Sequence, residues 1–233
     1  MPRELAISGT HAFVMKVLNE AISSPGSTRV LDIGAGQGAL SVRLVAAGYQ
    51  VDACDYVPEQ FDVEGITCRR CDDTGILPFE DEPFDLAVAV EVLEHIDGHE
   101  GFFREAARVL KPGGRLLFTT PNILSLKSRL RFLFTGFFYS FDPLEPFTRD
   151  PVSQHIAPFS LNRYAWMLSQ QDLTVEKVLT DKTQRSSIFL SCLIPFIRLC
   201  SRLRYGENPH AKAQNSVTVL LGRKLVIIAR KAL

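Results

Sequence analysis

The sequence predicts an α/β fold built on a doubly wound, Rossmann-like sheet. Two observations carry this prediction. A short apolar strand over residues 30–33 ends in Gly34, Gly36 and Gly38, and a helical pattern follows at once. Strand-like and helix-like segments then alternate, and the first strand–helix–strand unit takes about 30 residues. Units of this kind build parallel sheets that helices cover on both faces.

The elements before the middle of the chain follow from apolar spacing. Helices are predicted over residues 10–24, ended by Pro25 and Gly26, and over residues 39–47, ended by Gly48. Strands are predicted over residues 30–33, 49–54, 65–71 and 86–90. The last of these is a nearly unbroken apolar run, which is typical of a strand covered on both faces.

The remaining elements extend the same alternation. A helix with Phe102, Phe103 and Ala106 on one face ends at residues 111–114, and a fifth strand follows over residues 115–119. A helix begins near Ser160, and residues 173–179 and 224–231 supply the sixth and closing strands. The prediction is therefore seven strands.

Composition places the chain among ordinary globular proteins. Its 233 residues are 46% hydrophobic and 22% charged, enough for one α/β domain that we predict to span residues 1–233. Twenty-six basic residues balance 26 acidic ones. No overall electric field therefore favours nucleic acid as a partner.

Targeting signals and cysteines indicate the compartment. The N-terminus lacks the pattern of a secretory signal, and no stretch approaches the roughly 18 apolar residues of a spanning helix. An odd number of cysteines, five, favours reduced thiols, so we expect a cytoplasmic chain. Cys68 and Cys71 have the spacing of a redox or half-metal site, but no second ligand pair accompanies them, which favours simple strand thiols.

The glycine-rich turn after the first strand is the predicted ligand site. Glycine permits positive φ and lets a ligand approach the backbone, and the next helix turns its N–H groups and dipole toward an anionic or polar group. Asp55 ends the second strand beside this turn, where a carboxylate can accept both hydroxyls of a ribose. A solvated aspartate that caps the following turn is the alternative.

Five motifs in order resemble the class I S-adenosylmethionine-dependent methyltransferases, and in particular the group that includes the ubiquinone-biosynthesis O-methyltransferases. They are Val-Leu-Asp-Ile-Gly-Ala-Gly-Gln-Gly at residues 30–38, the acid at Asp55, Leu-Pro-Phe at 77–79, Val-Leu-Glu-His at 92–95 and Leu-Lys-Pro-Gly-Gly at 110–114. Each motif is weak alone, but the ordered set is specific. The resemblance implies a mostly parallel seven-stranded sheet whose last strand is antiparallel.

The resemblance also implies S-adenosyl-L-methionine as the cofactor and assigns residues to it. Gly34, Ala35 and Gly36 would contact the methionine part, Asp32 its ammonium group and Asp55 the ribose. Either Asp72 or Asp73 would meet the adenine amino group. Val90 and Glu91 would line the site near the sulfonium, and Gly38 and Tyr56 complete the predicted set. A carboxylate-rich mouth suits a ligand with two positive charges.

Methyl transfer to oxygen needs a proton acceptor, and two histidines are candidates. His95 follows the fourth strand, and His155 lies ahead of Pro158. In the ubiquinone-type relatives the Glu-x-x-Glu-His stretch is associated with a divalent metal, which would group Glu91, Glu94 and His95. We assign no metal ligand from the sequence, and whether a divalent metal binds near these three residues stays open. The alternative is that Glu94 and His95 only cap and start a helix.

Two other functions fit parts of the pattern. The spacing of Gly34, Gly36, Ala39 and Asp55 also satisfies a dinucleotide fingerprint. Against it, Asp32 stands where dinucleotide-binding proteins usually have an apolar residue, and the Leu-Pro-Phe and Leu-Lys-Pro-Gly-Gly motifs have no role in hydride transfer. A scaffold that binds the cofactor without catalysis is the second alternative, but it would have no reason to keep the carboxylate set.

Helical insertions after the fifth and sixth strands, residues 123–159 and 183–215, are predicted to form the acceptor region. Residues 10–122 would form the cofactor-binding half. Both insertions interleave apolar side chains with cations such as Arg131 and Arg198. We predict a lid over a small or lipid-linked acceptor, with peripheral contact at the inner face of the membrane. A dimer interface and added core packing are the alternatives, and the oligomeric state stays open.

Overall fold

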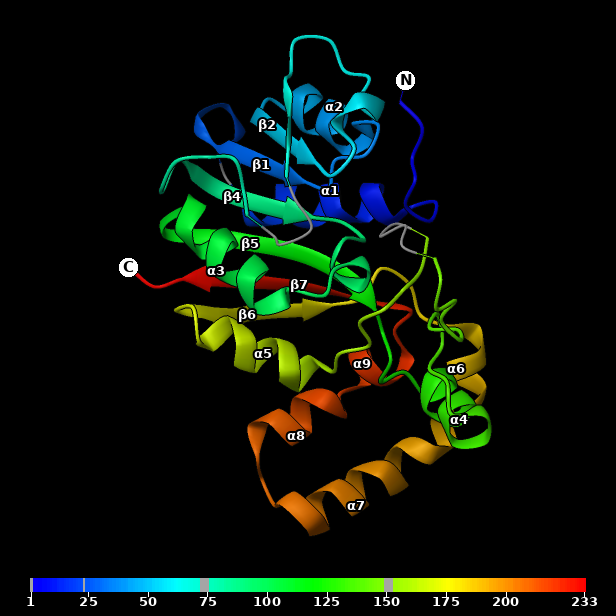
Figure 1. Cartoon of the computed structure of the whole chain (residues 1–233). Helices are drawn as coiled ribbons and strands as arrows, with labels where there is room; N and C mark the ends of the chain where they lie inside the picture. Colours follow the sequence, from blue (N-terminus) through cyan, green and yellow to red (C-terminus); the bar gives the residue numbers. More distant parts are fainter. Residues whose placement is uncertain (1, 23, 72–75, 149–152) are drawn as a thin grey trace.

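The computed structural model describes residues 2–22, 24–71, 76–148 and 153–233. In these residues seven strands form one sheet in the order β3-β2-β1-β4-β5-β7-β6 (Figure 1). The strands are β1 (Arg29–Ile33), β2 (Gln50–Asp55), β3 (Cys68–Arg70), β4 (Phe84–Ala89), β5 (Leu110–Pro121), β6 (Leu173–Leu179) and β7 (Lys224–Lys231). β1 pairs in parallel with β2 and β4, whereas β7 is antiparallel to both β5 and β6. The predicted doubly wound sheet with an antiparallel last strand is confirmed.

Helices cover both faces of this sheet, and the pleat of the strands explains the two cores. They are α1 (Thr10–Ala21), α2 (Ala39–Ala46), α3 (His99–Val109), α4 (Leu126–Thr135), α5 (Leu161–Ser169), α6 (Arg185–Phe189), α7 (Ile194–Tyr205), α8 (Pro209–Gln214) and α9 (Val217–Leu221). Successive side chains of a strand point to opposite faces. Leu31 therefore packs with α3 and α5, and Val30 packs with α1 and α2.

The boundaries differ most from prediction in the first helix, the third strand and the fifth strand. The first helix ends at Ala21 rather than at residue 24, and the third strand is only Cys68–Arg70. β5 starts at Leu110, because the Lys-Pro-Gly-Gly stretch pairs with β4 through a bulge instead of forming a separate turn. A Cβ at Gly114 would lie 2.8 Å from the Lys111 carbonyl oxygen, so the bulge requires glycine.

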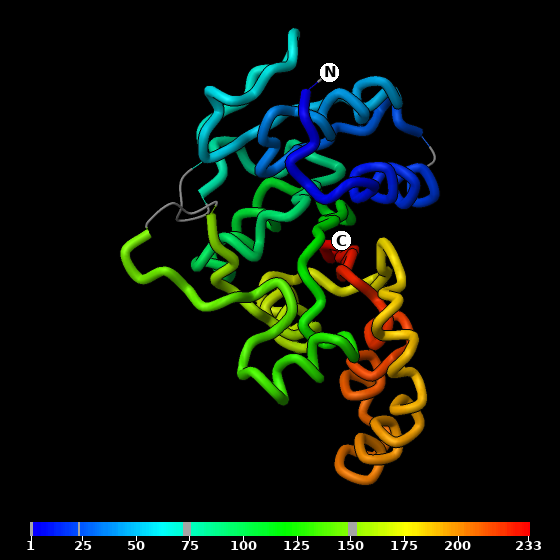
Figure 2. Tube along the Cα trace, turned by 90° about the vertical axis from the view of Figure 1, so that its right-hand side faces the viewer, coloured from blue at the N-terminus to red at the C-terminus, as the bar shows by residue number. Residues whose placement is uncertain are grey.

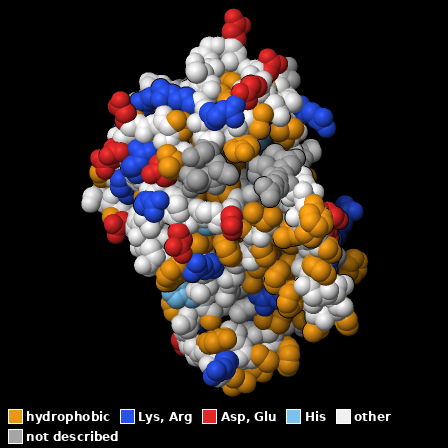
Figure 3. Space-filling view, in the orientation of Figure 1, with side chains coloured by type: hydrophobic (Ala, Val, Ile, Leu, Met, Phe, Trp, Pro, Cys, Tyr) orange, Lys and Arg blue, Asp and Glu red, His pale blue; other side chains and the backbone are white. Residues whose placement is uncertain are grey.

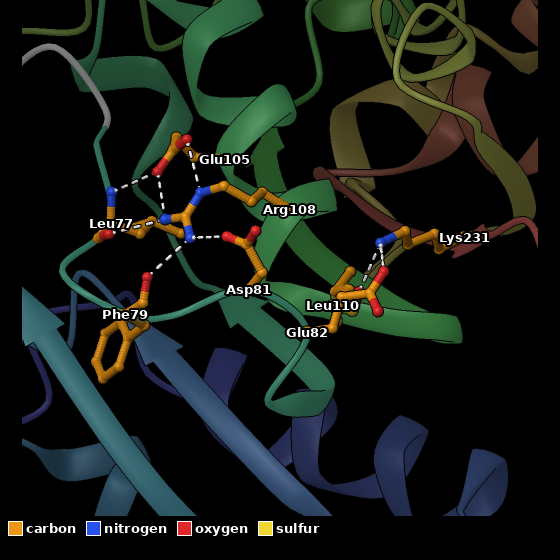
Figure 4. Close-up of polar contacts among 8 residues, drawn as sticks. All are labelled: Leu77, Phe79, Asp81, Glu82, Glu105, Arg108, Leu110 and Lys231. Carbon is orange, nitrogen blue, oxygen red and sulfur yellow. Dashed lines mark hydrogen bonds and ion pairs between the residues drawn. The ribbon is translucent and has the colours of Figure 1, made fainter.

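The Leu-Pro-Phe loop is held by one arginine of α3. The Arg108 guanidinium donates to the carbonyl oxygens of Phe79 and Leu77 at 2.8 and 3.0 Å, and to the carboxylates of Asp81 and Glu105 at 2.8 and 2.7 Å (Figure 4). The Leu77 N–H donates a hydrogen bond to the Glu105 carboxylate at 3.1 Å. The hydrogen bonds from Arg108 lower the pKa of Glu105. A motif that resembled a family signature thus has a local structural role.

The two insertions extend away from the sheet. α4 follows β5, and α6 to α9 follow β6, with α7 and α8 forming the part of the molecule most distant from β1 in Figures 1 and 2. Pro195 lies in the first turn of α7, where its missing N–H needs no partner within the helix. In the part of the chain that the structure describes, no helix has the length and apolar character needed to cross a bilayer. All five cysteines are thiols.

Candidate functional site

The turn after β1 is fixed between two neighbouring strands. The N–H groups of Gly34 and Ala35 both donate to the Cys54 carbonyl oxygen of β2, at 2.9 and 3.2 Å. Gly34 has a φ of 70°, and a Cβ there would lie 2.3 Å from Cγ2 of Val92, beyond β4. Only glycine fits this backbone and this approach. The turn therefore depends on the segment after β4 as well as on β2.

Helix α2 begins directly behind this turn. Gly38 occupies the N-cap position with a φ of 89° and has no side chain with which to cap the helix. The first N–H groups of an α-helix have no partner within the helix, and its dipole favours negative or polar groups there. The start of α2 is therefore suited to hydrogen-bond acceptors of a ligand.

Asp55 ends β2 and connects this turn to the next loop. One carboxylate oxygen accepts the N–H of Gly36 and the other accepts the N–H of Val57, both at 2.8 Å. An ionised carboxylate has about four acceptor positions, so two remain for hydroxyl donors. Tyr56, the next residue, is exposed, and its carbonyl oxygen accepts a hydrogen bond from Arg70 at 2.8 Å.

Asp32 is an acid inside the sheet. It is only 2% exposed, and its Oδ2 accepts the hydroxyl proton of Ser41, in the first turn of α2, at 2.6 Å. Burial raises the pKa of Asp32 to about 6, and the nearby charge of Asp55 adds to this increase. An ionised group in such a place is stabilised by a cationic partner. The position of Asp32 therefore favours a positively charged ligand.

Glu91 stands at the end of β4 in a left-handed conformation, with a φ of 58°. Its N–H donates to Oγ1 of Thr119 in β5 at 2.9 Å. Its carboxylate forms an ion pair with Lys224, the first residue of β7, and accepts the N–H of Ile7 at 3.1 Å. Burial lowers the pKa of Lys224 to about 8. A non-glycine residue held in this conformation by three elements is a common feature of functional sites.

The segment ahead of α1 lies along the same edge of the sheet. The N–H of Arg3 donates to Oε1 of Gln37 at 3.2 Å, and Glu4 forms an ion pair with Arg43. A Cβ added at Gly36 would meet the Leu5 side chain at 3.0 Å. The N-terminal residues therefore cover the glycine turn, which no sequence pattern predicted.

A second polar group lies beyond β4. The chain after α4 returns to the turn Leu93–His95, where the Ile156 N–H donates to the Glu94 carbonyl oxygen at 2.8 Å. The rings of His95 and His155 have centroids 4.8 Å apart. Ligand-type atoms of Glu94, His95 and His155 all lie within 4.8 Å of one another. The fold thus brings together two histidines that are far apart in the sequence.

Glu94 is the buried member of this group. It is 1% exposed, burial raises its pKa to about 8, and among the described residues none hydrogen-bonds its Oε2. A buried oxygen without a partner fits either a carboxyl proton or a cation. The grouping implied by the resemblance is corrected in one respect, because Glu91 is paired with Lys224 and His155 stands beside Glu94 and His95 instead.

A sequence profile of a methyltransferase domain family matches residues 6–178. The chain belongs to this methyltransferase family. The match begins ahead of α1 and reaches into β6, so it includes the glycine turn, Asp55 and both histidines. Membership supports the methyltransferase prediction against the nicotinamide-dependent alternative.

Curated relatives of this methyltransferase domain share only part of their length with it. A demethylmenaquinone methyltransferase of Tropheryma whipplei is 38% identical over 94 residues, which are 38% of this chain and 39% of the relative. A ubiquinone biosynthesis O-methyltransferase of Coxiella burnetii is 31% identical over 159 residues, which are 65% of this chain and 66% of the relative. The chain therefore spans less than two thirds of the length of these relatives.

Solved structures of methyltransferases share the fold over nearly the whole chain. An S-adenosylmethionine-dependent methyltransferase from Mesorhizobium loti has a TM-score of 0.56 at 16% identity, covering 93% of this chain and 96% of that one. Another, from Archaeoglobus fulgidus, has a TM-score of 0.58 at 18% identity, covering 96% and 95%. The predicted class I methyltransferase fold is confirmed.

The predicted site residues of this methyltransferase domain divide into three sets. Those at the carboxyl ends of β1, β2 and β4 lie around the glycine turn: Asp32, Gly34, Ala35, Gly36, Gly38, Asp55, Tyr56, Val90 and Glu91. His95 and His155 form the second group. Asp72 and Asp73 lie outside the described residues.

Sequence reasoning missed Ser41, Thr119 and Lys224. A hydroxyl in the first turn of the helix after the glycines could have indicated Ser41 as the partner of Asp32. No local signal indicated Lys224, because it comes from β7 at the other end of the chain.

Proposed function

We propose that this chain is an S-adenosylmethionine-dependent methyltransferase that methylates a hydroxyl oxygen of a small or lipid-linked, quinone-related acceptor. The observation that carries the proposal is the buried carboxyl group of Asp32 beside a glycine turn whose opposite side is formed by Asp55. Family membership supports the reaction. The names of the relatives, which act in menaquinone and ubiquinone chemistry, support the acceptor class.

The residues around the turn suit the cofactor. Asp32 would pair with its ammonium group, which would compensate the buried carboxylate. The backbone of residues 34–36 would contact the methionine part, and the two unused acceptor positions of Asp55 would take the ribose hydroxyls. Val90 and the backbone of Glu91 would lie near the sulfonium. Contact of Asp72 or Asp73 with the adenine stays a prediction.

When bound, S-adenosylmethionine supplies a methyl group whose bonding electrons return to sulfur as the acceptor oxygen bonds to carbon. The chain's part is to align the acceptor, exclude water and remove the hydroxyl proton. The Nδ1 atoms of His95 and His155 lie 3.0 and 2.7 Å from the carbonyl oxygens of Gln154 and Ser140, so each Nδ1 carries a proton and donates it. Each Nε2 therefore carries the lone pair that a base needs.

A divalent cation fits the same histidines. Two imidazole nitrogens and Oε2 of Glu94, to which no described residue donates a hydrogen bond, form a ligand set that transition metals accept. Glu94, His95 and His155 would hold the ion, which would lower the pKa of an acceptor hydroxyl. Thermal unfolding of chelator-treated protein, with and without added Mn²⁺ or Zn²⁺, separates this arrangement from direct proton transfer, because only a bound ion raises the midpoint.

The test of the proposed function is methyl transfer itself. The chain is incubated with methyl-labelled cofactor and catechol-containing quinone precursors of different tail length, and the label in the organic phase is measured. His95→Gln and His155→Gln should each lower kcat about 100-fold or more while leaving cofactor affinity unchanged. His210→Gln, in the exposed helix α8, is the matched control and should keep full activity.

Two results would change the proposal. Cofactor binding without transfer to any acceptor would favour the scaffold alternative. Transfer to amine or carbon acceptors only would keep the enzyme and remove O-methylation. The proposal also includes a lid role for residues 123–159 and 183–215. It includes a cytoplasmic location with contact at the inner membrane face. The exposed apolar side chains of both insertions support these two parts.

A further inference from the structure

The half-buried residues of helix α7 are Ile194, Ile197 and Ser201, so this side of the helix faces the protein. Arg198 donates through Nε to the Asn215 carbonyl oxygen at 3.1 Å, and the Asn215 side chain donates to Oγ of Ser201 at 3.1 Å. Arg202 pairs with Glu207, in the turn before α8, at 3.0 Å. These polar contacts hold α7 to α8 and the segments that flank it. A helix on the surface of a globular protein ordinarily packs its apolar stripe inward.

The apolar stripe of α7 faces solvent. Phe196, Leu199 and Leu203 are 66%, 54% and 78% exposed, and they are spaced three and four residues apart, so they share one face of the helix. None of the residues of α7 is buried. Phe189, 86% exposed, and Leu193 precede the stripe at the same spacing. The stripe therefore extends beyond α7 toward α6.

Helix α4 adds a second set of exposed apolar side chains. Leu133 and Phe134 are 74% and 77% exposed. α4 is joined to the second insertion by the Lys127 N–H, which donates to Oγ of Ser187 at 3.2 Å, and by Arg129, which donates to the Gln214 carbonyl oxygen at 3.0 Å. Figure 3 shows hydrophobic side chains gathered over α4, α6 and α7. We name the exposed side chains of Phe132, Leu133, Phe134, Phe189, Leu193, Phe196, Leu199 and Leu203 the outer apolar face.

The charge around this face is strongly one-sided. Helix α4 and residues 185–214 together contain eight Lys and Arg residues and one acid, Glu207, although the whole chain has equal numbers of the two kinds. Cations beside exposed aromatic and aliphatic side chains are the pattern of helices that lie in the headgroup region of anionic membranes. A second copy of the chain would bring the same cations against each other, which opposes self-association through this face.

We propose that the outer apolar face inserts into the surface of a bilayer that contains anionic phospholipid, while the flanking Arg and Lys side chains contact the lipid phosphates. α4, which carries three of the eight residues of this face, lies within the range that the family profile matches, and α7 lies outside that range. The proposal goes beyond methyl transfer and does not require it, because it rests on exposure and charge alone.

The first test is flotation of the full chain with vesicles. Vesicles of phosphatidylcholine with about 30% phosphatidylglycerol should carry the protein upward, vesicles of phosphatidylcholine alone should carry much less, and about 0.5 M salt should weaken the binding. The double variant Leu199→Asp/Leu203→Asp should lower the bound fraction about tenfold. Val45→Asp, at a 48% exposed position of α2, is the matched control and should bind as the wild type does.

The second test places a reporter in the face. Trp166 is the single tryptophan, so Phe196→Trp in a Trp166→Phe background reports on α7 alone. Its emission should shift to the blue when the anionic vesicles are added and should not depend on protein concentration without them. Absence of vesicle binding, equal binding to both vesicle types, or a concentration-dependent dimer that Leu203→Asp dissociates would each overturn the proposal. Calorimetry with the cofactor on the same variants reports separately on the proposed function.

Discussion

The turn after β1 and the outer apolar face invert the usual rule of burial in opposite senses. Asp32 is an acid that is 2% exposed, whereas Leu203 is an aliphatic side chain that is 78% exposed. Ordinary cores contain leucine and ordinary surfaces carry aspartate. In the first region the fold sets a charge where only a cation could compensate it, and in the second it leaves apolar surface where only an apolar phase could cover it.

The two regions also differ in how their backbones are fixed. The turn is hydrogen-bonded to β2 and leads directly into α2. Its Gly34 lies so close to Val92, in the segment after β4, that there is no room for a Cβ. Helix α7 is attached by a few polar contacts to α8 and the segments beside it. Substitutions in the first region should therefore affect stability and ligand binding together, whereas substitutions in the second should affect only an external interaction. The following changes test that contrast, in order of decreasing effect.

Gly34→Ala should have the largest effect. The added methyl group would lie 2.3 Å from the Val92 side chain, on a backbone with a φ of 70°. We expect a loss of about 2–4 kcal/mol in the free energy of unfolding, from strain and overpacking, and loss of cofactor binding. Urea unfolding measures the first. Gly26→Ala is the control, because no atom of the described residues lies within 4 Å of its added Cβ, and an equal loss there would remove the steric explanation.

Asp32→Asn should separate stability from function. The folded-state pKa of Asp32, about 6, lies above the ordinary value of 3.8, so the buried charge costs about 3 kcal/mol at neutral pH. The asparagine oxygen can still accept the Ser41 hydroxyl. We expect the ligand-free variant to unfold at higher urea concentration than the wild type while it binds the cofactor at least about 100-fold more weakly. A variant that is less stable and binds normally would contradict this role.

Cofactor affinity should depend on pH through the same group. Because the pKa of Asp32 is raised to about 6, its carboxyl group is ionised above that pH and protonated below it. Calorimetric affinity should be nearly constant above about pH 7 and fall about tenfold per pH unit below 6. As the pH falls below 6, the contribution of Asp32 to the free energy of unfolding of the ligand-free chain should increase. Affinity that is flat between pH 5 and about 7, on the order of one pH unit either side of the pKa of Asp32, would exclude a charge-dependent contact.

Arg108→Lys should have a moderate effect that is confined to the Leu-Pro-Phe loop. Lysine cannot reproduce the planar set of hydrogen bonds to Leu77, Phe79 and Glu105 (Figure 4). We expect a loss of about 1–3 kcal/mol in the free energy of unfolding, measured in urea. Arg163→Lys, which pairs with Glu100 on the surface, should change stability by less than about 0.5 kcal/mol. Equal effects at both positions would show that the loop is not held by Arg108.

Leu203→Asp should have the smallest effect on stability. Its side chain is 78% exposed, so the free energy of unfolding should change by less than about 0.5 kcal/mol. Leu117→Asp, at a position with 0% exposure in β5, should prevent folding. Circular dichroism and urea unfolding compare the two. A large loss for Leu203→Asp would mean that α7 packs against the protein through its apolar stripe.

Much of the fold could be predicted because its signals are local. The apolar run of β4, the glycines after β1 and the spacing of α3 each depend on a few consecutive residues. The predicted boundaries were wrong where strand pairing includes residues that are typical of turns. Residues 111–114 are the example, because they belong to β5 and pair with β4 through a bulge. The shortness of β3 reflects its place at the edge of the sheet.

The site was less predictable, because its partners come from distant segments. The positions of Asp32 and Asp55 at strand ends followed from the βαβ pattern. The contact of His155 with His95 depends on the course of the chain after α4, and the pairing of Glu91 with Lys224 depends on the antiparallel insertion of β7. Nor does apolar spacing alone say which side of α7 faces the protein; only the contacts with Asn215 show it.

The most direct test of the account is a calorimetric titration of the wild-type chain near neutral pH with S-adenosylmethionine, S-adenosylhomocysteine and NAD in separate runs. We expect one molecule of either sulfur compound to bind per chain and no heat of binding with NAD. Heat with NAD alone, or none with either sulfur compound, would contradict the assignment of Asp32, the glycine turn and Asp55 to a sulfonium cofactor.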